Sequence, residues 1–206
     1  MTDEINKILD TVAEMYQKYG IKSVTMDDVS RELGISKKTL YQYFADKSDL
    51  VGKTVDRELV KIARKYENVV KQNFNAIEEI LEFNRIGSEM VKNYSASANY
   101  DLKKYYPELL EKVKKVRREK MYAMVLENLK KGKSQGLFRK NLNEEIIAKL
   151  HVSRITEMAG NTCFTHEELM SSEVFLEIFI YHIHGIANVK GLDILEKNLK
   201  KNGIHV

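Results

Sequence analysis

The stretch TMDDVSRELGISKKTLYQYFADKSDL, residues 25–50, decides the fold of the N-terminal part of the chain. Thr25 offers the hydroxyl of a helix N-cap, and Asp28 follows at the third helical position, a weaker form of the capping box. Gly34 comes about two turns later, where the residue that follows a helix often needs a positive φ. The stretch therefore predicts a short helix from about Met26 that ends at a tight turn.

A second helix is predicted directly after this turn. Ser36 can cap it, and Leu40 and Phe44 stand four residues apart, so both face inward. Upstream, apolar residues at helical spacing between Ile5 and Tyr16 predict a further helix that ends near Gly20. The two short helices and the glycine turn form a helix-turn-helix. The outer face of the second short helix then carries Lys37, Lys38, Thr39, Gln42 and Tyr43.

The side chains on this outer face suit the bases and phosphates of DNA. A helix that projects from the surface of its domain can enter a major groove about 12 Å wide. Lys37 and Lys38 can then reach guanine or phosphate, Gln42 can pair with adenine, and Thr39 can touch a thymine methyl. Tyr41, Tyr43 and Lys47 suit phosphate oxygens. The full set of expected DNA contacts is Thr25, Lys37, Lys38, Thr39, Tyr41, Gln42, Tyr43 and Lys47.

On these residues the chain resembles the TetR family of bacterial transcriptional regulators. The shared pattern is a Thr that opens the second helix, L-G-I-S at the turn, T-L-Y-Q-Y-F on the recognition helix and a Lys shortly after, and it covers about residues 5–52. A weaker similarity, G-K-S-Q-G-L-F-R followed by N-L-N-E-E, lies within residues 132–145. The resemblance implies a DNA-binding domain over residues 1–50 and a helical ligand-binding and dimerisation domain over residues 51–206.

The resemblance also implies a function. It is that of a homodimeric, ligand-responsive transcriptional regulator, most often a repressor, whose partners are a palindromic double-stranded operator, a small-molecule effector and a second copy of the chain. An activator or a ligand-independent co-regulator would carry the same DNA-binding unit. A helical enzyme or scaffold whose N-terminal helices imitate this unit is a remote alternative, and we expect no enzymatic activity because no catalytic motif is present.

Composition agrees with an all-α protein. The chain has 206 residues, 43% of them hydrophobic and 31% charged, but only one Pro and ten Gly, too few turn residues for a β-sandwich or barrel. One Cys cannot form an intramolecular disulfide, so we expect a reducing, cytoplasmic setting. We expect no signal peptide and no membrane span. The net charge of +4 has its basic excess between residues 101 and 140, so the DNA-binding hypothesis rests on the motif.

Two helices near the C-terminus are apolar on more than one side. The first is expected from a cap at Asn143 to about Gly160, and the second, predicted as the last helix, from Glu173 to about Val189. One-sided packing needs an apolar arc of only about 100°, so the second face of each helix is expected to meet a partner chain. The expected interface residues are Ile147, Ile155, Phe175, Phe179, His182 and Ile186.

The region between the DNA-binding segment and these helices is long enough to enclose an effector. Aromatic and Met side chains gather in it, and most of them suit ordinary core packing equally well. Those that line a pocket would favour a mainly apolar or aromatic ligand. The expected pocket residues are Phe83, Met90, Tyr94, Tyr105, Met121, Tyr122 and Met124.

No cofactor and no metal site are expected. His182 and His184 are the most conspicuous pair of possible metal ligands, but they are two residues apart and so lie about 200° apart around a helix. The sequence also lacks a glycine-rich phosphate loop and an H-E-x-x-H motif.

Overall fold

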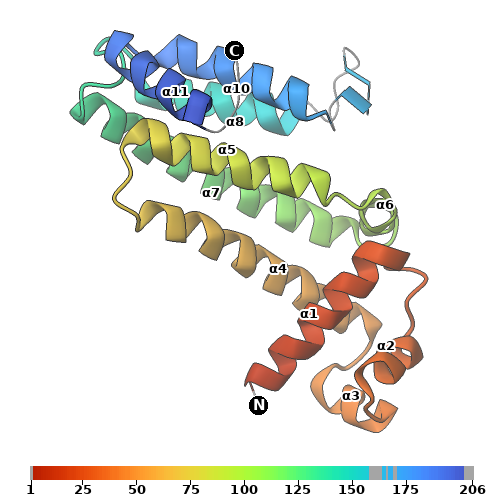
Figure 1. Ribbon diagram of the computed structural model, residues 1–206. Coiled ribbons are helices and arrows are strands. Elements are labelled where there is room, and N and C mark those ends of the chain that lie inside the picture. Colours follow the sequence, from red (N-terminus) through yellow and green to blue (C-terminus); the bar gives the residue numbers. More distant parts are fainter. Residues whose placement is uncertain (1, 158–163, 166, 169–170, 202–206) are drawn as a thin grey trace. The chain divides into compact units, whose positions relative to one another are not determined.

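The computed structural model describes residues 2–157, 164–165, 167–168 and 171–201, and helices form most of these residues (Figure 1). Between the helices, one isolated bridge pairs Phe138 with Ala187. The all-α prediction is confirmed. None of the described helices is long and apolar enough to span a bilayer. The helices are α1 (Thr2–Tyr19), α2 (Met26–Leu33), α3 (Lys37–Tyr43), α4 (Lys47–Val70), α5 (Ala76–Lys92), α6 (Ala96–Tyr105), α7 (Pro107–Ser134), α8 (Glu144–Glu157), α10 (Ser172–Ile186) and α11 (Val189–Lys201).

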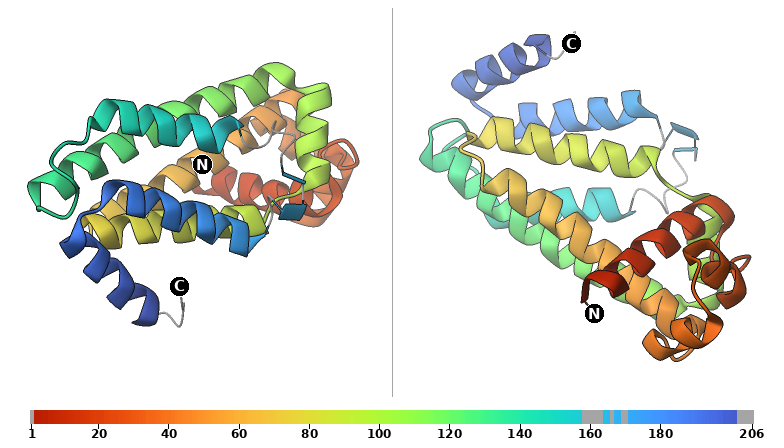
Figure 2. Two further views of the ribbon diagram at one scale, coloured as in Figure 1. Left: turned by 90° about the horizontal axis from the view of Figure 1, so that it is seen from above. Right: turned by 60° about the horizontal axis from the view of Figure 1, so that its bottom comes forward.

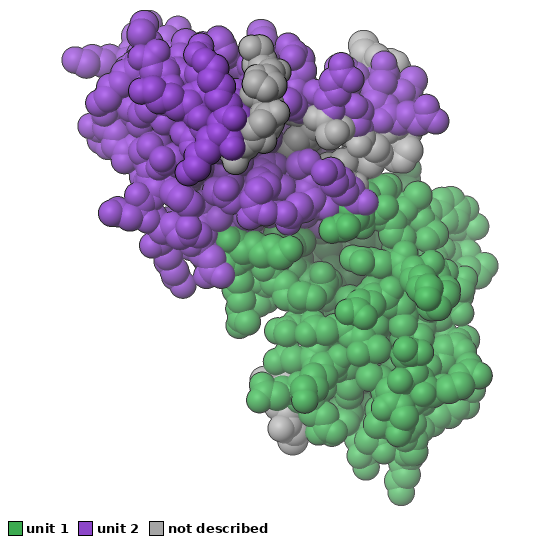
Figure 3. Space-filling view, viewed as in Figure 1, with its two compact units in different colours: residues 1–65, 93–115 green, residues 66–92, 116–206 purple. Residues whose placement is uncertain are grey.

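The chain forms two compact units (Figure 3). Unit 1 comprises residues 1–65 and 93–115, and unit 2 comprises residues 66–92 and 116–206. The segment 93–115, with α6 and the start of α7, therefore belongs to the unit that contains the helix-turn-helix. This grouping describes packing, and the functional division at residue 50 stays a prediction.

Unit 1 has its own hydrophobic core. Most of the predicted stripe of α1 is buried in it, including Val12 and Tyr16, together with Leu40 and Phe44; Ile5 at the start of the stripe is partly buried. Figure 2 shows α1, α2 and α3 of this unit from two further sides. Ala98, Leu102 and Tyr106 of the segment 93–115 also pack against this core, so α6 is part of its wall.

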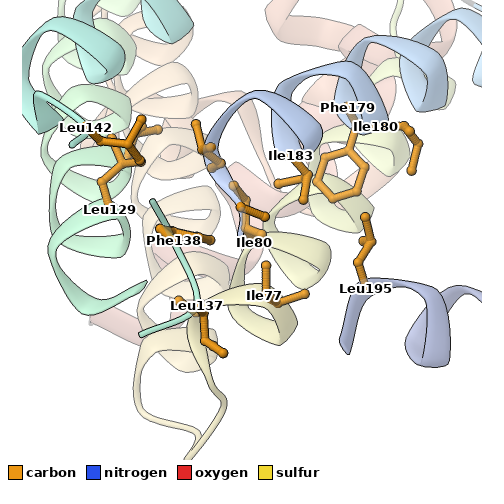
Figure 4. Close-up of a cluster of buried hydrophobic side chains, with 14 of the residues drawn as sticks. Ile77, Ile80, Leu129, Leu137, Phe138, Leu142, Phe179, Ile180, Ile183 and Leu195 are labelled. Atoms are coloured by element: carbon orange, nitrogen blue, oxygen red, sulfur yellow. The ribbon is translucent and has the colours of Figure 1, made fainter. Parts of the chain in front are cut away.

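Unit 2 is built around a second core (Figure 4). Ile77 and Ile80 of α5 and Leu129 of α7 belong to it, and Ile183 of α10 is fully buried in the same cluster. Leu195 of α11 is buried in the same cluster. The weakly similar segment G-K-S-Q-G-L-F-R contributes as well, since Leu137 and Phe138 lie in this core.

The helix predicted to run to about Val189 as the last one ends earlier, and that prediction is wrong. α10 ends at Ile186 because Ala187 is extended (φ −75°, ψ 154°), and α11 follows. Asn188 lies between the two helices. Its side-chain amide donates to the carbonyl oxygens of Gly136 (2.9 Å) and Phe138 (3.3 Å), while its Oδ1 accepts from the N–H of Gly191. These contacts with a distant segment stop one helix and start the next.

Candidate nucleic-acid interface

Local side-chain caps fix the helix-turn-helix. The Thr25 hydroxyl accepts from the backbone N–H of Asp28 (3.2 Å), and the Asp28 carboxylate accepts from the backbone N–H of Thr25 (2.9 Å), so the capping box is complete. Gly34 has φ +65°, as its predicted place after α2 requires. Ser36 accepts from the N–H of Thr39 (3.0 Å) and caps α3. All three predicted caps are confirmed.

The turn also ties α3 to α2 through the backbone. The N–H of Ile35 donates to the carbonyl oxygen of Ser30 at 3.0 Å, and the N–H of Gly34 donates to the carbonyl oxygen of Arg31 at 3.2 Å. Leu40 and Phe44 anchor the far side of α3, since both are almost completely buried. The direction of α3 is therefore set by α2 and by the core of unit 1.

Four of the predicted DNA contacts are exposed on α3, and three of them have no hydrogen bond or ion pair with other described side chains. These three are Lys38, Tyr41 and Gln42; Tyr41 is 50% exposed. An ammonium, a phenol and a carboxamide on one short helix can together contact phosphate and read base edges. These exposed residues make α3 the candidate recognition helix.

The other predicted contacts already have partners within the chain. Lys37 is ion-paired with Asp27 of α2, and the hydroxyl of Thr39 lies 2.8 Å from that of Ser36. A hydrogen bond with the Glu4 carboxylate raises the pKa of Tyr43. Thr25 donates from its hydroxyl to Asp28 (2.6 Å). Each would have to exchange or share its partner to contact DNA.

Lys47 also has an internal partner. Its ammonium donates to the backbone carbonyl of Lys22 at 3.0 Å. Partial burial lowers the pKa of Lys47, while the negative charges of Asp101 and Asp28 act in the opposite direction. This contact differs from the phosphate contact expected from the sequence, and the role of Lys47 toward DNA stays a prediction.

Two basic residues near α3 were missed at the sequence level. Lys53 of α4 donates to the carbonyl oxygen of Tyr43 (3.1 Å), at the C-terminal end of α3, and pairs with Asp49 (2.8 Å). A cation at a helix C-terminus is favoured by the helix dipole, and that rule could have singled it out. Arg31, exposed on α2, pairs with Asp28 and gives this acidic helix one outward cation.

The predicted effector residues are divided between the two units. Tyr94 and Tyr105 belong to unit 1, and both are exposed. The other five belong to unit 2 and are half-buried: Phe83, Met90, Met121, Tyr122 and Met124. Among these, Phe83 makes an edge-to-face contact with Tyr66 at 5.6 Å between ring centroids, and Met121 and Tyr122 pack against the core of unit 2.

The predicted interface residues are also divided. Phe179, His182 and Ile186 are buried within the single chain, whereas Ile155 is exposed and Ile147 is half-buried. Phe175 lies on α10, but its side chain is outside the described residues. Other large apolar side chains on the same two helices are far more exposed: Ile146 (60%), Leu150 (63%) and Tyr181 (76%).

His182 is in contact with His151 of α8, with 4.2 Å between ring centroids. Burial lowers the pKa of His182 to about 3 and that of His151 to about 4, and the nearby Arg154 guanidinium acts in the same direction. Both imidazoles are therefore neutral near pH 7. Within the described part of the chain, no group of three or more His, Cys, Asp or Glu side chains could hold a metal ion.

The sequence and the fold of this chain are similar to those of known regulators of transcription. Residues 8–53 match the model of the family described as bacterial regulatory proteins, tetR family. An HTH-type transcriptional regulator of Staphylococcus aureus is 26% identical over 76 residues, which are 37% of this chain and 40% of that protein. The match thus spans less than half the length of that relative.

Longer similarity exists to two other proteins. The uncharacterized HTH-type transcriptional regulator YvaF of Bacillus subtilis is 26% identical over 168 residues, covering 80% of this chain and 86% of that protein. The solved structure of a TetR/AcrR-family transcriptional regulator from Thermobifida fusca has a TM-score of 0.63 at 17% identity, covering 89% of this chain and 98% of the other. At this identity the structural likeness shows the fold alone.

Proposed function

We propose, from the premise that the chain belongs to the TetR family of bacterial regulatory proteins, that it is a homodimeric repressor. It binds a palindromic operator and leaves it when a small, mainly apolar effector binds. The observation that carries the proposal is the capped helix-turn-helix. Its α3 exposes Lys38, Tyr41 and Gln42 while Leu40 and Phe44 hold it to the core.

The recognition helix reads the major groove. The carboxamide of Gln42 can donate to and accept from adenine at once, and the ammonium of Lys38 can donate to guanine. The Tyr41 hydroxyl can donate to a phosphate oxygen, which fixes the register of α3 without reading sequence. Lys37 joins these contacts when it exchanges Asp27 for DNA.

The dimer brings two recognition helices to one duplex. Ile146 and Leu150 stand four residues apart on α8 and so share a face, and both are more than half exposed. Tyr181 of α10 is more exposed still. Large apolar side chains of this kind favour burial against a second copy, and an isologous interface has two-fold symmetry. Two-fold symmetry in the protein requires a palindromic operator.

The effector acts by favouring one state of the dimer over another. A ligand that bound both states equally would shift nothing, so it must prefer a state whose recognition helices do not match successive major grooves. Half-buried aromatic and Met side chains such as Phe83 and Met121 in unit 2 suit an apolar ligand. Tyr122 can orient the ligand through its hydroxyl.

A mobility-shift assay with the DNA that flanks the chain's own gene tests the proposal. We expect a discrete complex that survives competition by unrelated duplex. Failure to bind any duplex at low salt would instead favour a helical enzyme or scaffold. Small molecules that raise the melting temperature are then added to the complex, and we expect the effector among them to release the DNA. A ligand that strengthens the complex would favour a co-repressor mechanism.

A further inference from the structure

Side chains from two distant helices hold the turn between α1 and α2. The carboxylate of Asp101 on α6 accepts a hydrogen bond from the backbone N–H of Lys22 at 2.7 Å. On the other side of the same residue, the ammonium of Lys47 on α4 donates to the backbone carbonyl of Lys22 at 3.0 Å. Both backbone polar groups of one turn residue are thus satisfied by charged groups, one from each helix.

The turn is shaped to admit Asp101. Gly20 directly follows α1; it has φ +82° and donates its N–H to the carbonyl of Tyr16. A Cβ at Gly20 would lie 3.0 Å from Asp101 Oδ2 and 3.5 Å from the Cβ of Ser97. Both the backbone angle and the close approach of α6 therefore favour glycine at this position.

The contact differs from a surface ion pair. Asp101 is only 8% exposed, and a buried carboxylate is costly unless it is hydrogen-bonded. Its negative charge acts on both Lys22 and Lys47. Loss of the negative charge would weaken the hydrogen bond from the N–H of Lys22, because a charge-assisted hydrogen bond is stronger than one to a neutral oxygen.

Movement of this turn would be transmitted to the recognition helix. Lys22 lies three residues before Thr25, whose side chain caps α2, and α2 holds α3 through the hydrogen bond from Ile35 to Ser30. The other end of the contact belongs to the segment 93–115, which is joined in the chain to α5 and to the remainder of α7, both in unit 2.

We propose that Asp101 is a positioning residue for DNA recognition. With Lys47 it holds the turn at Lys22, so that the segment 93–115 sets the direction of α3. Asp101 contacts no base or phosphate. The inference rests on the proposed function, because its consequence is the preference of α3 for an operator.

The first test uses the full-length protein without DNA. Asp101→Asn removes the charge and keeps the size of the side chain, and Glu108→Gln removes an exposed carboxylate in the same unit as a matched control. We expect amide hydrogen exchange at Lys22 and in residues 25–28 to rise roughly tenfold in Asp101→Asn and to stay unchanged in Glu108→Gln. Unchanged exchange at Lys22 would overturn the proposal.

The second test compares the affinities of the same variants for the operator and for an unrelated duplex. We expect Asp101→Asn to bind the operator roughly tenfold more weakly. Binding to the unrelated duplex should be unchanged or slightly stronger, because this binding depends on charge. Equal loss on both duplexes, or no loss on the operator, would overturn a positioning role. If the wild-type protein binds no duplex, the proposed function itself fails. Unchanged exchange at Lys22 would overturn only the positioning role of Asp101 and would leave the proposed function standing.

Lys47→Gln tests the other side of the turn and guards against a folding defect in Asp101→Asn. We expect amide hydrogen exchange in residues 25–28 of the protein without DNA to rise as it does in Asp101→Asn. A double variant should show less than the two single increases combined, since both residues hold one turn. Fully additive increases would show that the two contacts act independently and would overturn the joint role.

Discussion

Lys37, the first residue of the recognition helix, is ion-paired with Asp27 of α2. Both side chains are more than half exposed, so the pair adds little to the stability of the fold. Its proposed importance lies in DNA binding. Lys37, which the motif would offer to DNA, is paired with a neighbouring acid, so we expect binding to exchange one partner for the other. We therefore expect Asp27 to weaken unselective attraction to phosphate.

Asp27→Asn should release Lys37 and increase binding to DNA of any sequence. We expect the affinity for an unrelated duplex to rise several-fold, and the salt dependence to become steeper by about one counterion. Fluorescence anisotropy over a series of salt concentrations measures both. Glu32→Gln, which removes an exposed acid from the same helix, is the control. Equal effects of the two variants would show that the pairing with Lys37 is irrelevant.

Gln42→Ala should relax the preference at one base pair of each half-site. We expect discrimination at that position to fall by about 1–3 kcal/mol while the other positions keep theirs. Binding to a panel of operators, each with one base pair replaced, gives the profile. Gln72→Ala, a change at an exposed glutamine outside the helix-turn-helix, should leave the profile intact. A uniform loss at all positions would contradict the assigned base contact.

Local rules predicted the helix-turn-helix well. The caps at Thr25 and Ser36 and the positive φ of Gly34 depend on residues within four positions, and so do the inward faces of Leu40 and Phe44. Each of these features was predicted from the sequence and is present in the structure. Sequence alone was sufficient here because the information is local.

Contacts between distant residues were not predictable in the same way. Lys47 donates to a carbonyl 25 positions away, and Asp101 accepts from an N–H 79 positions away. The end of α10 depends on contacts between Asn188 and the carbonyls of Gly136 and Phe138. Nothing in the neighbouring sequence marks these pairs, because they arise from packing.

Leu150→Glu should weaken the proposed dimer. Leu150 is 63% exposed on α8, so the substitution leaves the core of unit 2 intact but places a charge on the apolar face. We expect a monomer in light scattering at micromolar concentration and a large loss of operator affinity. Lys149→Glu changes the neighbouring exposed residue and should stay dimeric. A stable dimer of Leu150→Glu would place the interface elsewhere.

The buried imidazoles predict a loss of stability in mild acid. In the folded state the pKa of His182 is about 3 and that of His151 about 4, whereas an unfolded histidine has a pKa of about 6.5. The unfolded chain therefore binds more protons as the pH falls below about 6.5. The free energy of unfolding should decrease by up to about 1.4 kcal/mol per histidine for each pH unit, until the folded pKa values are reached.

Chemical denaturation at pH 7 and pH 5 measures this effect. His182→Gln should lose less stability between the two pH values than the wild-type protein, because one of the depressed titrations is removed. His184→Gln, which changes the exposed histidine two residues further on, should behave as the wild type. If all three proteins lose the same free energy, protonation of His182 has no part in acid unfolding.

Selection of bound sequences from a pool of random duplexes is the most direct measurement of the central claim. The wild-type protein is predicted to enrich a palindrome whose half-sites lie about one helical turn apart. A variant with Lys38, Tyr41 and Gln42 all replaced by Ala should keep its melting temperature, because these side chains are exposed, and should enrich no sequence. Failure of the wild-type protein to enrich any sequence, or enrichment of the same palindrome by the triple variant, would contradict the assignment of α3 as the helix that reads DNA.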